Sequence, residues 1–221
     1  VDLDGFSGSS LSTTDVTEIN VQVAANASQT MTFDADLATL TLGALDSNDT
    51  SVTLANNDVT ATVTGSTNTN DSISITADNE VKLVMDTQQV EDVTLTGSNG
   101  ALTVTLDGVG VGAGTANDVT YTIAGSNDVS LIGNVEDFAG ATLVNGSSGD
   151  VALSVASTAD ATQQDLDGFG VLGGGITLSG TTDLSVLVDS GNTITSTNTD
   201  VVTIDTNDTT STSSVTSFFL T

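Results

Sequence analysis

The feature that most constrains this chain is a short alternating pattern, in which Val, Leu or Ile takes every second position and Thr or Ser usually takes the others. Clear examples are Leu37–Leu42 (LATLTL), Val59–Thr64 (VTATVT), Ser72–Thr76 (SISIT) and Leu102–Leu106 (LTVTL). Successive side chains of a strand point to opposite sides, so a period of two indicates strands with one buried and one solvated side. The pattern predicts an all-β protein.

The spacing of these runs is compatible with more than one all-β architecture. From Ser72 to Leu102 successive runs start roughly 9–12 residues apart, which is typical of sandwiches, barrels and β-solenoids. Asn, Asp and Gly separate the runs, and these residues suit both hairpin turns and solenoid corners. Aromatic residues make up only 3% of the chain, which favours the narrow aliphatic interior of a β-solenoid. A β-sandwich, or a filament subunit of the donor-strand type, remains the alternative because no strict repeat length is visible.

Residues 156–175 interrupt the alternating pattern and suggest an internal boundary. We expect residues 1–155 to form the main β domain and residues 156–175 to form a crossover or linker that ends in a Gly-rich loop. Residues 176–221 then supply C-terminal strands packed on the same domain. Within the linker, Thr158–Leu166 is the one candidate for a short helix, with a loop equally compatible.

The charge balance is one-sided and excludes whole classes of partner. The chain carries 29 acidic residues and one base, Lys82, for a net charge of −28. Nucleic-acid binding needs Lys and Arg to neutralise phosphates, and an anionic membrane surface repels such a chain. No apolar run approaches the roughly 18 residues of a membrane span, so we expect no membrane insertion. Asp accounts for 25 of the 29 acids, and Asp favours turns, so the charge should lie in loops.

The scarcity of basic residues also favours an extracellular location. A single basic residue leaves trypsin-like proteases one cleavage site, which suits an extracellular protein. The sequence begins at Val1 without Met, as expected after removal of a signal peptide or for a fragment of a longer protein.

Several Asp-rich segments have the oxygen ligands that Ca²⁺ prefers. The pentapeptide DLDGF occurs twice, with Asp2 and Asp4 in one copy and Asp165 and Asp167 in the other, and Asp107 lies in a partial copy. In D-x-D-G two carboxylates lie on one side of a turn that Gly allows to bend tightly. These segments predict calcium sites; the simpler interpretation is two Asp-Gly turns anchored by a buried Phe.

Catalysis is hard to build from these residues. Without His or Cys the chain has no Ser-His or Cys-His nucleophile, and zinc would have to rely on carboxylates. Paired carboxylates hydrolyse glycosides, but sugar clefts usually stack aromatic rings on the substrate, and this chain has only six Phe and one Tyr. Lys82 is expected to be a solvated strand residue. We therefore expect a protein that is not an enzyme.

Several segments resemble a known family. Val16–Val21, Ser28–Phe33 with Leu37–Leu42, and Val90–Thr96 resemble the Thr/Ala/Asn-rich S-layer proteins of the RTX type, which are exported by type I secretion. The run from Asn145 to Leu153, with Asp150, resembles a degenerate RTX nonapeptide. The resemblance implies a calcium-bound β-solenoid that forms a two-dimensional lattice on a cell surface, with Asp150 as a calcium ligand.

These observations lead to one functional hypothesis and one rival. The hypothesis is an extracellular structural protein that forms a homo-polymer, either a surface layer or a filament, through the edges of its strands. Cell-surface polysaccharide is a further possible partner. The rival is an adhesin or carbohydrate-binding module of a larger secreted protein.

Overall fold

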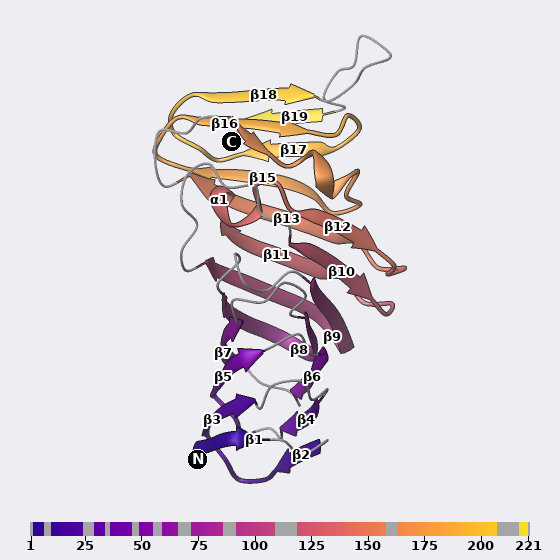
Figure 1. Cartoon of the computed structure of the whole chain (residues 1–221). Coiled ribbons are helices and arrows are strands. Elements are labelled where there is room, and N and C mark those ends of the chain that lie inside the picture. The colour runs from indigo at the N-terminus through magenta and orange to yellow at the C-terminus, as the bar shows by residue number, and fades with distance from the viewer. Residues whose placement is uncertain are drawn as a thin grey trace.

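A computed structural model shows a β-solenoid, so the favoured fold is confirmed and the sandwich alternative is not observed. The structure describes residues 2–6, 10–23, 29–33, 36–45, 49–54, 59–65, 72–85, 92–108, 119–157, 163–206 and 217–220. The coils stack along one axis, and the two ends of the chain lie at opposite ends of the stack (Figure 1).

Two ladders of parallel strands run along this axis. We call them the first face and the second face. The first face contains β1 (Asp2–Phe6), β3 (Glu18–Val23), β5 (Thr39–Leu45), β7 (Val59–Gly65), β11 (Val129–Asn134), β13 (Val151–Ser157), β15 (Gly175–Gly180), β17 (Thr193–Ser196) and β19 (Ser217–Leu220). The second face contains β2 (Ser10–Thr13), β4 (Gln29–Phe33), β6 (Asp49–Leu54), β10 (Thr120–Ala124) and β12 (Thr142–Asn145). It continues as a separate three-stranded sheet of β14 (Gln164–Asp165), β16 (Leu184–Val188) and β18 (Val202–Thr206).

Two long strands belong to both faces. The first part of β8 (Ser72–Met85) pairs with β6 on the second face, and its last part pairs with β7 on the first face. The first part of β9 (Asp92–Gly108) likewise pairs with β10, and its last part with β11. Each of the two strands therefore bends around a corner of the solenoid, and the register between them shifts between Ala77 and Asn79.

The interior consists of aliphatic rows that follow the stack. Because the strands are parallel and mostly in register, one inward position recurs in every coil. A fully buried row on the first face shows this regularity: Val59, Val81, Val104, Leu131, Leu153, Ile176 and Ile194 are successive register partners. The alternating runs of the sequence therefore become continuous hydrophobic rows.

Three buried aromatic rings form a cluster in the coils that contain the two short helices. Tyr121 of β10, Phe138 of helix α1 (Val135–Phe138) and Phe169 of the 3-10 helix η1 (Asp167–Phe169) are buried, with ring centroids 5.8–6.3 Å apart. Helix α1 has a capping box in which Asn134 and Asp137 satisfy each other's backbone N–H groups. In the stretch expected to contain a helix, Gln164–Asp165 is a strand, and 158–162 lie outside the described residues.

Candidate functional sites: acidic corners and end strands

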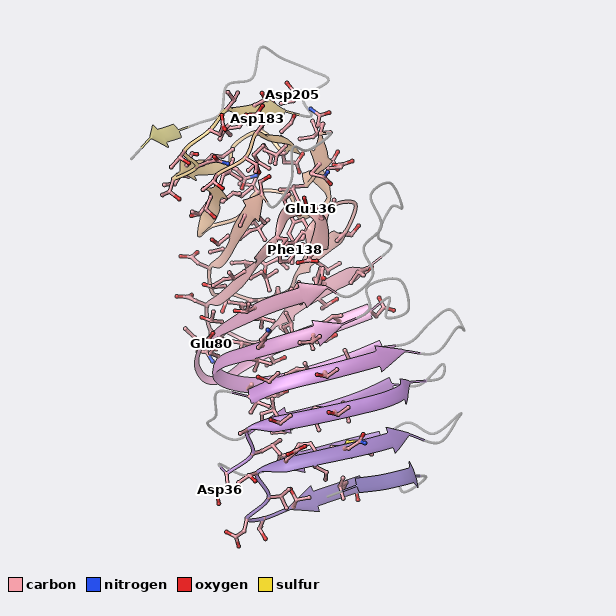
Figure 2. The ribbon with its side chains drawn as sticks, turned by 90° about the vertical axis from the view of Figure 1, so that its left-hand side faces the viewer. Asp36, Glu80, Glu136, Phe138, Asp183 and Asp205 are labelled. Carbon is pink, nitrogen blue, oxygen red and sulfur yellow. The ribbon has the colours of Figure 1, made fainter. Side chains whose placement is uncertain are left out.

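The acidic residues of the described chain are divided about equally between the strands and the segments that connect them, so the prediction that the charge lies in loops is only partly correct. Asp128, Asp150, Asp183, Asp189 and Asp200 all stand outside the strands. Figure 2 shows Asp36 and Glu80 at the same margin of the ribbon. The outward positions of the strands mostly carry Thr and Ser. The faces therefore carry fewer charged residues than the corners, although Glu18 of β3, Lys82 of β8 and Asp205 of β18 are exposed on them.

Some corner carboxylates connect one coil to the next. Asp128 Oδ1 accepts a hydrogen bond of 2.8 Å from the backbone N–H of Asp150, and Asp183 Oδ1 accepts one of 3.3 Å from Val201 N–H. In both pairs the accepting Asp and the N–H donor precede strands of neighbouring coils. Part of the Asp content is thus explained by backbone N–H groups that the ladders leave without a partner.

The first copy of DLDGF is not a turn. Asp2 and Asp4 lie in strand β1, and Asp107 lies in strand β9, so the expectation of tight Asp-Gly turns at these positions is wrong. Each segment continues a parallel ladder, in which Asp2 pairs with Asn20 and Asp107 with Val84. The side chains of all three Asp residues lie outside the described part of the structure.

Asp150, from the RTX-like run, lies at an exposed corner before β13. A Cβ built on Gly173 would be 2.5 Å from Asp150 Oδ1, so this carboxylate lies directly against the glycine of the next coil. Gly173 therefore leaves the room that the Asp150 side chain occupies.

The second DLDGF copy does form a compact acidic corner. Asp165 Oδ1 accepts a 3.0 Å hydrogen bond from the Asp167 N–H, and η1 begins at Asp167. Partial burial raises the pKa of the Asp165 carboxyl above its usual range; the hydrogen bond from the Asp167 N–H opposes this shift, and the side chain and negative charge of Asp167 add to it. Asp189, in the next coil, has its pKa raised by partial burial and by the negative charge of Asp167. We call Asp165, Asp167 and Asp189 the acidic corner.

Sequence reasoning missed Asp189, although a signal for it exists. Asp189 follows Asp167 by 22 residues, and the neighbouring register partners Gln164 and Val186 are also 22 residues apart. A known coil length would have placed the two acids together.

The fit of this corner to calcium is partial. Mutual repulsion between carboxylates is what a divalent cation relieves, and carboxylate oxygens are the ligands Ca²⁺ prefers. However, no group of three or more acidic side chains in the described ranges is arranged to hold a metal ion. The corner therefore offers a two-carboxylate motif with a third acid near it.

Within the described residues, the strands at the two ends of the stack each have one edge with no strand paired to it. Among the described strands, β2 pairs only with β4 at one end, and β18 pairs only with β16 at the other. Inward residues reflect this position: Leu11 is only partly buried, whereas its partner Met31 is fully buried. Val202 and Ile204 of β18 are likewise only partly buried.

Comparisons with known proteins found no match, so a functional proposal has to be argued from the fold and from these sites. The sequence matches no protein-family model, and no curated protein or solved structure shows significant similarity to it. No helix in the described residues is long and apolar enough to cross a bilayer.

Proposed function

We propose that this chain is an extracellular, non-catalytic structural protein whose copies join end to end through the unpaired edges of their terminal coils. The observation that carries the proposal is that the described strands leave both ladder ends open, with inward side chains that are only partly buried: Leu11 at one end, and Val202 and Ile204 at the other. Unpaired strand edges are templates for further strands, and burial of the exposed apolar rows favours the same contact.

The polarity of the ladders sets the geometry of this assembly. All the strand pairs are parallel, so a second copy displaced along the axis presents strands that run in the same direction as those of the first. A head-to-head copy would present antiparallel strands instead. The contact is therefore heterologous and does not close, which produces a filament.

We expect cations to favour this assembly because the chain is strongly negative. Two copies with a net charge of −28 repel each other, and salt or Ca²⁺ lowers this repulsion. The acidic corner is the place in the described chain where we propose that Ca²⁺ binds, through Asp165 and Asp167. Calcium is then an aid to assembly, and chelation should shorten the filaments.

The test compares two substitutions of the same kind. Val202→Lys places a charge in the half-buried interior of the end strand β18, and Val144→Lys places one on the outward side of β12, where Val144 is 48% exposed. We expect wild type and Val144→Lys to form filaments at micromolar concentration in electron micrographs, and Val202→Lys to remain monomeric.

Two results would contradict the proposal. A wild-type chain that stays monomeric, with or without a calcium chelator, would favour an adhesin or polysaccharide-binding module, or a longer protein whose own further coils cover these edges. Equal filament formation by Val202→Lys and Val144→Lys would show that the end strands are not the contact.

A further inference from the structure

Four neighbouring strands of the first face contain no charged residue. These strands are β11 (VSLIGN), β13 (VALSVAS), β15 (GITLSG) and β17 (TITS). One outward row runs across all four through the register partners Ile132, Ser154, Thr177 and Thr195. We call the outward surface of these four strands the neutral patch.

The neutral patch is distinguished by its extent, because elsewhere on the first face only the neighbouring strands β5 and β7 are both free of charged residues. Lower on the same face, β8 carries Glu80 and Lys82, and on the second face the strand ladder is interrupted between β12 and β14. Within the patch Ile132 is 37% exposed, and Ala152 and Ala156 are half-buried among Ser and Thr. In a chain of net charge −28, this is a broad, uninterrupted surface where two copies could meet without opposing their acids.

The size of the patch determines when it can act. Four strands about 4.8 Å apart, with about 3.3 Å per residue, cover an area on the order of 350 Å². A stable interface buries about 800 Å² on each partner, so two isolated molecules should not stay together through this patch. In a filament each subunit adds one patch to a row, and many weak contacts then act together.

We propose that the neutral patch is a lateral docking surface for a second copy of this chain, through which filaments pair side by side, first face against first face. The proposal rests on the end-to-end assembly argued above. It adds a second direction of growth, in which the neutral patches meet and the acidic corners remain outside, accessible to cations.

The experiment uses single substitutions at matched serines. Ser154 lies in the neutral patch, and Ser74 lies on the outward side of β8 on the second face; both are half-buried and flanked by paired strands. We expect Ser154→Glu and Ser154→Lys both to abolish paired filaments in electron micrographs while single filaments persist. Ser74→Glu and Ser74→Lys should leave pairing unchanged. Loss with Lys as well as Glu separates contact at the patch from a change in net charge.

The outcomes distinguish the two proposals. Wild-type filaments that are always single, or pairs that survive both Ser154 substitutions, would overturn lateral docking and leave the end-to-end filament intact. A wild-type chain that forms no filaments would overturn both.

Discussion

The broad faces and the corners of this solenoid are built by different rules. On the faces successive coils use different aliphatic residues at the same position, as in the buried row from Val59 through Val104 to Ile194. At the corners each coil has its own solution. At the corner between β10 and β11, Asn127 Nδ2 donates to Gly97 O of the preceding coil, and at the corner after β11 helix α1 fills the space.

The difference follows from hydrogen bonding. A strand in a parallel ladder satisfies its backbone groups through its neighbours, so its sequence needs only the alternating pattern. At a corner the ladder stops, and each freed N–H or C=O needs a partner of its own. Substitutions at the corners should therefore depend on the individual position, whereas the outward face should tolerate exchange.

The largest effect is expected where a corner contributes to the core. Phe138→Ala removes a buried ring that contacts Tyr121 and Phe169, and such truncations cost about 3–5 kcal/mol. Urea unfolding of Phe138→Ala and of Phe138→Leu measures this, with the Leu variant losing much less. A loss below about 1 kcal/mol for the Ala variant would show that this corner is not part of the core.

The second-largest loss of stability is expected at Gly168, where two backbone segments approach closely. A Cβ on Gly168 would be 2.3 Å from the backbone oxygen of Ala141, which cannot move aside as a side chain can, whereas a Cβ on Gly100 meets nothing within 4 Å. Gly168→Ala should therefore destabilise by about 1–3 kcal/mol, the usual cost of overpacking. Gly100→Ala, its matched control, should leave the thermal midpoint within error of wild type. Equal midpoints for both variants would contradict the packing at η1.

The third prediction concerns a buried corner amide. Asn192 accepts a hydrogen bond from Leu172 N–H at 2.9 Å and donates to the carbonyls of Gly170 and Asp189. Asn192→Ala leaves these groups unsatisfied, at a cost of about 1–3 kcal/mol. Asn145 is exposed and accepts one local hydrogen bond from Ser147, so Asn145→Ala should change the free energy of unfolding by less than about 0.5 kcal/mol. If the two variants are equally stable, corners are as tolerant as faces.

The smallest effect on stability is expected at the acidic corner, where a substitution should stabilise the protein and not destabilise it. The raised pKa values of Asp165 and Asp189 mean that the folded state binds protons more tightly than the unfolded state. Stability should therefore rise as the pH falls from neutral through these raised pKa values, and level off below the ordinary Asp range. Asp189→Asn should raise the thermal midpoint slightly at pH 7 and lose this advantage in acid.

Asp92→Asn is the control for net charge, because Asp92 is exposed at the start of β9. A stabilisation of the same size in Asp92→Asn would attribute the effect to overall charge and not to the acidic corner.

The same contrast explains what the sequence could predict. The alternating runs became strands and buried rows, because period two is imposed by strand geometry itself. The repeat length stayed hidden because corners differ in length: Asp2 pairs with Asn20, 18 residues on, whereas Val129 pairs with Leu102, 27 residues back. No strict period survives such variation.

The candidate sites divide in the same way. The motif predicts that Asp165 and Asp167 lie on one side of a turn, and the structure shows the Asp167 N–H donating to Asp165 Oδ1. Asp189 comes near them only through the stacking of coils. The unpaired ends and the neutral patch depend on strand order, which a single sequence does not reveal. Helix α1 was missed because its four residues are too few to show a helical period.

The most direct test of the account is sedimentation velocity of the 221-residue chain across a range of micromolar concentrations, followed by electron microscopy of the same samples. End-to-end joining predicts a sedimentation coefficient that increases with concentration, and filaments whose two ends differ. A single small species whose sedimentation coefficient does not change with concentration or calcium would contradict the assembly that the open strand edges imply.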